Sequence, residues 1–118
     1  MAYIRKYCGP IILDINRGQL RKYCGPVIYE VSNGLMRRYC GPAIYAFHDQ
    51  DIREYCGPII MTLTNGQIRR YCGPVFAVVE NYRYIREYCG PILYEIDGSL
   101  NQDELMMLIT YIFELREI

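Results

Sequence analysis

The chain has 118 residues, the size of one ordinary domain (1–118), and its 52% hydrophobic and 22% charged residues are typical of a globular protein. Thirteen basic residues balance thirteen acidic ones, so we expect no nucleic acid and no anionic membrane as partner. The first residues lack the apolar segment of a secretory signal, and no apolar run approaches the roughly 18 residues of a membrane span. We therefore expect a cytoplasmic protein with reduced cysteines.

A tetrapeptide, Tyr-Cys-Gly-Pro, occurs six times and contains every cysteine and every proline of the chain. The cysteines lie at 8, 24, 40, 56, 72 and 89, so four steps are of sixteen residues and one is of seventeen. The extra residue falls within 80–84, where a turn can absorb it. Residues 4–99 are therefore six tandem repeats, and 100–118 form a separate segment. A period this short suits two strands and two turns rather than a pair of helices.

The residues after each Gly-Pro alternate between apolar and polar side chains, as Val27, Tyr29 and Val31 illustrate. This alternation predicts a β-strand with one buried face. Asn33-Gly34 and Asn65-Gly66 follow two of these strands and are strong signals for a two-residue hairpin turn. Arg17-Gly18 and Asp97-Gly98 are weaker signals, and the turn at Asp49-Gln50 lacks a glycine.

The first half of each repeat is harder to assign to one face. A two-residue turn at Gly9-Pro10 would direct Lys6 and its equivalents toward the core, which is costly for unpaired charges. A β-bulge near Arg5-Lys6 that turns Tyr7 inward would avoid this cost. We favour the bulge.

The last segment predicts a helix from about Gln102 to Arg116. Asn101 is placed as its N-cap, and Glu104 stands three residues later, as in a capping box. Apolar side chains lie around most of the helix circumference, which indicates a buried helix. They include Leu105, Met106, Met107, Leu108, Ile109, Tyr111, Ile112, Phe113 and Leu115.

Six hairpins give about twelve antiparallel strands with one apolar face and a single helix to cover it. We therefore predict a mainly β fold, in which the antiparallel meander is rolled into a barrel and the helix packs in or on it. This arrangement hides the apolar face and removes the edges of the sheet. The alternative is a two-sided β-solenoid of parallel strands capped by the helix.

The chain resembles tandem β-hairpin repeat arrays of uncharacterised bacterial proteins. The resemblance is in the spacing of the aliphatic-Arg-x-Tyr segment, the Gly-Pro pair and the Asn-Gly or Asp-Gly turn. The chain resembles strand-turn-strand repeats such as the MORN type more loosely, because their aromatic-glycine pattern is absent. The resemblance covers residues 4–99, implies a β-meander and carries no catalytic residue over.

The six cysteines lack the close pairs of zinc ligands, and in a meander equivalent cysteines would stand roughly 9–10 Å apart, too far for disulfides. We interpret them as small buried thiols and expect neither metal nor cofactor. His48 is interpreted as an exposed turn residue.

Two rows of repeated side chains form a candidate interaction surface. Cross-strand packing is the favoured interpretation of the tyrosines, and a solvated ion-pair face that of the arginines. The rows are Tyr7, Tyr23, Tyr39, Tyr55, Tyr71 and Tyr88, and Arg5, Arg21, Arg37, Arg53, Arg69 and Arg86.

Because the chain shows no catalytic constellation, we do not expect an enzyme. A structural or protein-interaction module is favoured, with a protein partner or self-association into a homo-oligomer. The alternative is a carrier that holds a small apolar ligand in the barrel lumen.

Overall fold

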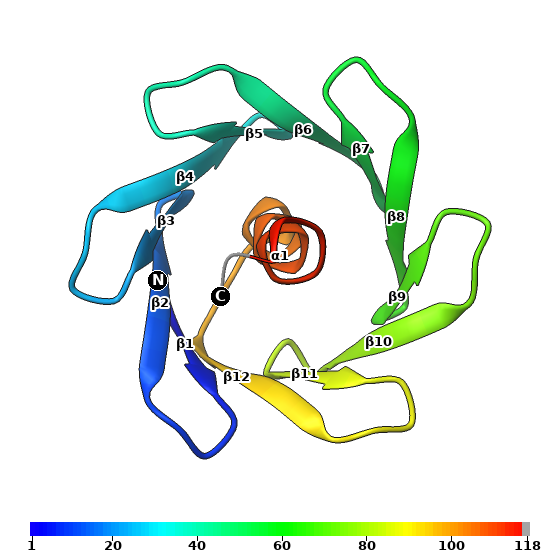
Figure 1. Ribbon diagram of the computed structural model, residues 1–118. Helices are drawn as coiled ribbons and strands as arrows, with labels where there is room; N and C mark the ends of the chain where they lie inside the picture. Colours follow the sequence, from blue (N-terminus) through cyan, green and yellow to red (C-terminus); the bar gives the residue numbers. More distant parts are fainter. Residues whose placement is uncertain (117–118) are drawn as a thin grey trace.

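The computed structural model describes residues 1–116 and shows a closed barrel of twelve antiparallel strands with a helix at its centre (Figure 1). Each repeat contributes a short strand and a longer one. The strands are β1 Ala2–Lys6, β2 Ile11–Asn16, β3 Gln19–Lys22, β4 Val27–Ser32, β5 Leu35–Arg38, β6 Ala43–His48, β7 Asp51–Glu54, β8 Ile59–Thr64, β9 Gln67–Arg70, β10 Val75–Glu80, β11 Tyr84–Glu87 and β12 Ile92–Gly98.

The first and last strands close the barrel. β1 pairs with β12 in antiparallel register, with Ala2 opposite Gly98 and Ile4 opposite Ile96. Closure pairs the two strands that would otherwise be edges of the sheet. The barrel with a central helix is therefore confirmed, and the parallel solenoid is excluded.

The register of the hairpins matches the apolar alternation. Val31 lies opposite Met36, and Leu63 lies opposite Ile68, as the Asn-Gly turns predict. All four side chains are buried in the single core of the barrel. The glycines of these turns have positive φ, and a Cβ on Gly66 would lie 2.7 Å from the carbonyl oxygen of Val79 in the next hairpin.

Every repeat contains a β-bulge, as predicted, but the extra residue lies in the second strand of the hairpin. In the first repeat Ile4 lies opposite Leu13 and Arg5 opposite Ile11, so Ile12 is the bulged residue. Tyr7 does not turn inward, and that part of the prediction is wrong. The equivalent bulged residues are Ile28, Ile44, Ile60, Phe76 and Leu93.

The bulges link neighbouring repeats and let the hairpins bend outward. The N–H of Tyr23 donates to the carbonyl oxygen of Ile12 at 3.0 Å, and the N–H of Tyr7 donates to Leu93 at 3.1 Å across the closure. Because a bulge bends its strand, the hairpin ends lean away from the barrel axis (Figure 1). Lys6, Lys22 and their equivalents thus stand at a widened mouth in contact with water, which avoids the predicted cost of burying them.

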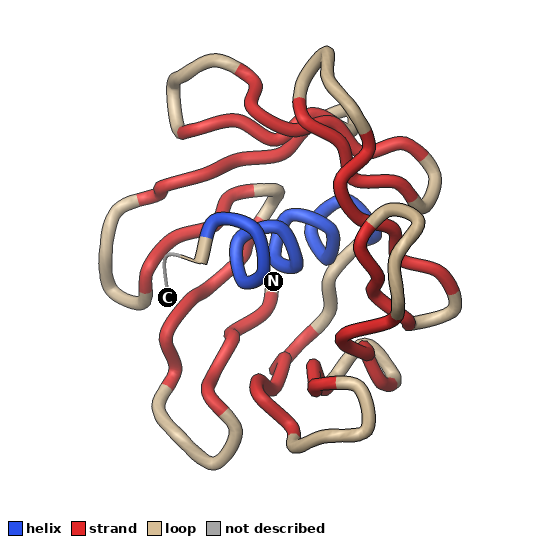
Figure 2. The backbone as a smooth tube through the Cα atoms, turned by 45° about the vertical axis from the view of Figure 1, so that its right-hand side comes forward, coloured by secondary structure: helices blue, strands red, loops and turns tan. Residues whose placement is uncertain are grey.

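The C-terminal segment lies along the barrel axis, inside the ring of strands (Figure 2). It is α-helical over Gln102–Ile109 (α1) and π-helical over Thr110–Leu115 (η1). Asn101 and Glu104 form the predicted capping box. The Thr110 hydroxyl donates to the carbonyl oxygen of Met106 at 2.8 Å, a contact that distorts helices and that accompanies the change to π geometry.

Candidate interaction surfaces

The Tyr-Cys-Gly-Pro loops are built alike in all six repeats. In the first, the Gly9 N–H donates to the carbonyl oxygen of Lys6 at 2.8 Å, and the Lys6 N–H donates to Pro10 at 3.3 Å. The loop is therefore four residues long rather than a two-residue Gly-Pro turn. Cys8 has φ 58°, a conformation uncommon outside glycine and asparagine, and the other five loop cysteines share it.

The six loops place a ring of tyrosines around the outside of the barrel, here called the tyrosine rim. Its members are 48% to 55% exposed, so about half of each side chain faces water. Tyr23 packs edge-to-face on Tyr3 at 6.1 Å between ring centroids, and Tyr7 packs on Tyr84 at 6.3 Å. The rim thus combines packing between hairpins with exposed aromatic surface. The rim is Tyr7, Tyr23, Tyr39, Tyr55, Tyr71 and Tyr88.

The cysteines differ from the prediction of buried thiols. All six are free and exposed, because each occupies the tip of a projecting loop rather than a strand that faces the core. The prediction of buried thiols was wrong because the four-residue loop between β1 and β2 removes Cys8 from the sheet.

The arginine row is only partly neutralised. Arg5 pairs with Asp97 at 2.9 Å and Arg21 with Asp14 at 3.5 Å. Arg86 Nε lies 2.7 Å from Glu80 Oε1, an ion pair without hydrogen-bond alignment. The other three arginines of the row are Arg37, Arg53 and Arg69, which belong to three consecutive repeats. Within residues 1–116 they have no carboxylate partner.

Two tyrosines at the widened mouth have perturbed acidity. Desolvation raises the pKa of Tyr45 above its ordinary value, and the carboxylates of Glu114 and Glu54 raise it further. Desolvation alone raises the pKa of Tyr94. Both phenols therefore stay neutral at physiological pH and act there as hydrogen-bonding, largely apolar groups.

The opposite end of the barrel carries the Asn-Gly turns and the start of α1. The Gly18 N–H donates to Glu104 Oε2 at 2.9 Å, and the Gly34 N–H donates to Asp103 Oδ2 at 3.2 Å. Glu104 is only 6% exposed, and its other oxygen accepts the Asn101 N–H at 3.0 Å. These two carboxylates fix the position of the helix relative to one side of the barrel.

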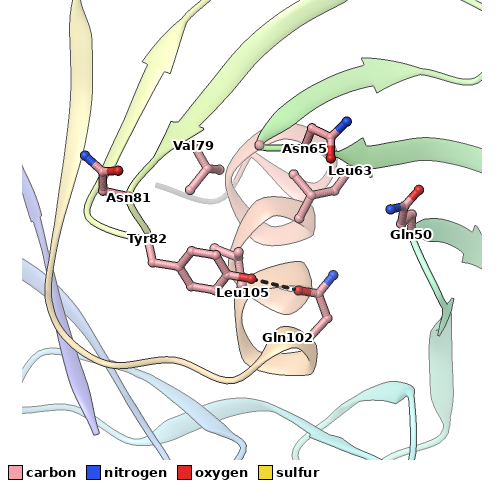
Figure 3. Close-up of a pocket in the computed structure, with 9 residues that line it drawn as sticks. Gln50, Leu63, Asn65, Val79, Asn81, Tyr82, Gln102 and Leu105 are labelled. Carbon is pink, nitrogen blue, oxygen red and sulfur yellow. Dashed lines mark hydrogen bonds between the residues drawn. The ribbon is translucent and has the colours of Figure 1, made fainter.

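A pocket of about 420 Å³ opens at the same end, beside Gln102 and Leu105 of the helix (Figure 3), and neither Gly18 nor Gly34 lines it. It lies among the turns that follow β6, β8 and β10 and the first turn of α1. The Tyr82 hydroxyl donates to Gln102 Oε1 at 3.2 Å across it. Sequence reasoning missed this pocket, although the seventeen-residue fifth repeat and the glycine-free turn at Asp49-Gln50 mark its position.

Among the described residues, no group of three or more His, Cys, Asp or Glu side chains is arranged to hold a metal ion. His48 is exposed, as predicted, and its Nε2 lies 3.5 Å from Asp49 Oδ2. In the same part of the chain, no helix is long and apolar enough to cross a membrane.

Comparison of the chain with models of known protein families, with curated proteins and with solved structures finds no match.

Proposed function

We propose that the protein is a non-enzymatic interaction module that self-associates through the tyrosine rim. The supporting observation is that six equivalent loops each present a tyrosine about half exposed. Tyrosine contributes a large, rigid contact area with two side-chain torsions, and it is enriched in protein interfaces. Six equivalent contacts strengthen the association, because once the first contact has formed, the others form within the same complex at a high effective concentration.

The charge of the chain favours a second copy as the partner. The formal net charge is zero, so two copies do not repel each other at long range. Arg37, Arg53 and Arg69 lack an ion pair within residues 1–116 and lie in the same repeats as Tyr39, Tyr55 and Tyr71. Arginine is enriched in interfaces, where its planar group stacks on aromatic rings.

The alternative of an apolar ligand in the lumen gains no support from this geometry. The space along the axis is occupied by the helix, whose residues Met107, Leu108 and Ile109 have no exposed surface. A protein partner remains the interpretation that the exposed surface favours.

Sedimentation velocity over a range of concentrations, with reductant present, tests self-association without disulfide artefacts. We expect the wild-type chain to form a defined oligomer and the triple variant Tyr39→Ser, Tyr55→Ser, Tyr71→Ser to be monomeric. The control is Tyr82→Ser, which removes an equally exposed tyrosine outside the rim and should leave the oligomer unchanged. A wild-type chain that stays monomeric at every concentration contradicts the proposal.

A further inference from the structure

The departures from the repeat pattern converge on one pocket. Among the first four hairpin turns, three have glycine at the second position, and the third turn has Gln50 instead. The fifth repeat has one residue more than the others, within the turn that contains Asn81 and Tyr82. Gln50, Asn81 and Tyr82 all line the pocket at the start of α1, on either side of the regular turn at Asn65-Gly66 (Figure 3).

The fifth turn keeps the hydrogen bond by which each regular turn accepts an N–H from the next hairpin, but the turn is one residue longer. The Ile96 N–H donates to the Arg83 carbonyl oxygen, as the Val79 N–H donates to that of Gly66. Arg83 therefore occupies the place of the turn glycine, and the insertion precedes it. Tyr82 has φ 55° and Asn81 before it has φ 52°, so this turn holds two non-glycine residues in the left-handed region, which is uncommon for a bulky residue. Each two-residue turn holds only one such residue, as Asn65 in the fourth turn, so the insertion adds a second left-handed residue that joining the strands does not require.

The polar groups of the pocket are neutral. Four carboxamide side chains and one phenol surround it: Gln50, Asn65, Asn81, Gln102 and Tyr82. Each carboxamide offers both donors and an acceptor, and a phenol offers one of each. The two glutamine oxygens accept hydrogen bonds from Thr64 and Tyr82 at 3.1 and 3.2 Å. Within residues 1–116 the side chains of Asn65 and Asn81 make no hydrogen bond.

The remaining lining is aliphatic, from Leu63, Val79 and Leu105. Among the described residues that line the pocket, none carries a formal charge. The carboxylates of Asp103 and Glu104 on the same helix turn disfavour an anion, and the positive end of the α1 dipole disfavours a cation. A pocket with neutral donors and acceptors over an apolar floor suits a ligand that is itself neutral and bears hydroxyl groups.

We propose that this pocket binds a neutral polyhydroxylated ligand, a saccharide of one or two rings. The volume of about 420 Å³ falls in the range of small-ligand pockets. The carboxamides exchange hydrogen bonds with the hydroxyl groups, and the Tyr82 ring packs on the C–H face of the sugar. This site lies apart from the tyrosine rim and does not depend on self-association.

Backbone amide NMR spectra of the full chain, titrated with glucose, N-acetylglucosamine and maltose, test the proposal. At least one sugar should cause saturable shifts of the Asn65, Gly66 and Tyr82 amides. The Gly18 and Gly34 amides occupy equivalent turns and do not line the pocket, so they serve as an internal control and should not shift. Gluconate and glucosamine, charged compounds of similar size, should bind more weakly than the neutral sugars.

Two variants separate binding from folding. Tyr82→Ala should weaken the sugar affinity about fivefold to tenfold, through loss of the aromatic contact. Arg17→Ala, at an exposed turn residue with φ 53° that lies outside the pocket and the rim, should leave the affinity unchanged. Absence of saturable shifts with all three sugars, equal shifts at Gly34 and Gly66, or stronger binding of gluconate would each overturn the proposal.

Discussion

The buried carboxylate of Glu104 joins the helix to the barrel, and its replacement by the isosteric Gln isolates that contribution. Glu104 accepts two backbone hydrogen bonds, from Gly18 at 2.9 Å and from Asn101 at 3.0 Å. A carboxamide nitrogen cannot accept, so Glu104→Gln leaves one of these N–H groups without a partner. A hydrogen bond to a charged group contributes about 1.5–3 kcal/mol, and a negative charge at a helix start about 0.3–1 kcal/mol. We expect a loss of about 2–4 kcal/mol in the free energy of unfolding.

Urea and thermal denaturation followed by circular dichroism measure this loss. For a domain of this size, 1 kcal/mol corresponds to roughly 4 °C, so Tm should fall by about 8–16 °C. The matched control is Asp49→Asn, which removes an exposed carboxylate from another turn and should change the stability by less than about 0.5 kcal/mol. An unchanged Tm for Glu104→Gln would refute the claim that this contact fixes the helix in the barrel.

Three further predictions concern the turns, the loops and the mouth of the barrel. Gly66→Ala should destabilise the protein by about 2 kcal/mol or more in urea denaturation, because φ is +77° and the new Cβ meets the Val79 carbonyl oxygen. Gly9→Ala, where φ is not positive, should cost clearly less, and equal costs would contradict the argument. All six cysteines should react with a thiol reagent in the folded protein at the rate of exposed thiols, whereas slow or partial labelling would indicate buried thiols. Because the pKa of Tyr94 is raised in the folded state, the folded protein keeps the phenolic proton at pH values at which the unfolded chain loses it. The contribution of the neutral Tyr94 side chain to the free energy of unfolding is therefore complete below about pH 10 and is lost as the pH rises through the folded pKa. Tyr94→Phe should therefore lose less stability than the wild-type chain above pH 10, and equal losses in urea denaturation would contradict this.

The strands, the hairpin register and the helix could be predicted from the sequence because local signals agreed with one another. The Asn-Gly turns and the apolar alternation both place Val31 opposite Met36, and the structure has this pair. The capping residues and the apolar circumference of residues 102–116 likewise agree on a buried helix. Agreement between local preference and overall packing is what makes a sequence specify one fold.

The loops could not be predicted in the same way, because their shape depends on contacts between repeats. The bulge is stabilised by a hydrogen bond from the next hairpin, as between Tyr23 and Ile12, and no pattern within one repeat reveals it. A loop of four residues rather than two then moves Cys8 out of the sheet and leaves Tyr7 half exposed.

The candidate sites differ in how far the sequence indicated them. The tyrosines and arginines were identified because they repeat, although which arginines lack an ion pair depends on side-chain geometry. The pocket was missed because its residues are those that break the repeat, and only the closed barrel brings Gln50 and Tyr82 to the same side of the helix.

Closure of the six hairpins around the helix is the claim on which both proposals depend, and methyl nuclear Overhauser contacts test it most directly. With isoleucine and methionine methyl groups labelled, we expect contacts between Ile4 and Ile96, which are paired across the closure. We also expect contacts from Met107 on the helix to isoleucines of the surrounding strands, because all of them are buried in one core. Absence of the contact between Ile4 and Ile96, together with rapid amide exchange in β1 and β12, would contradict the closed barrel.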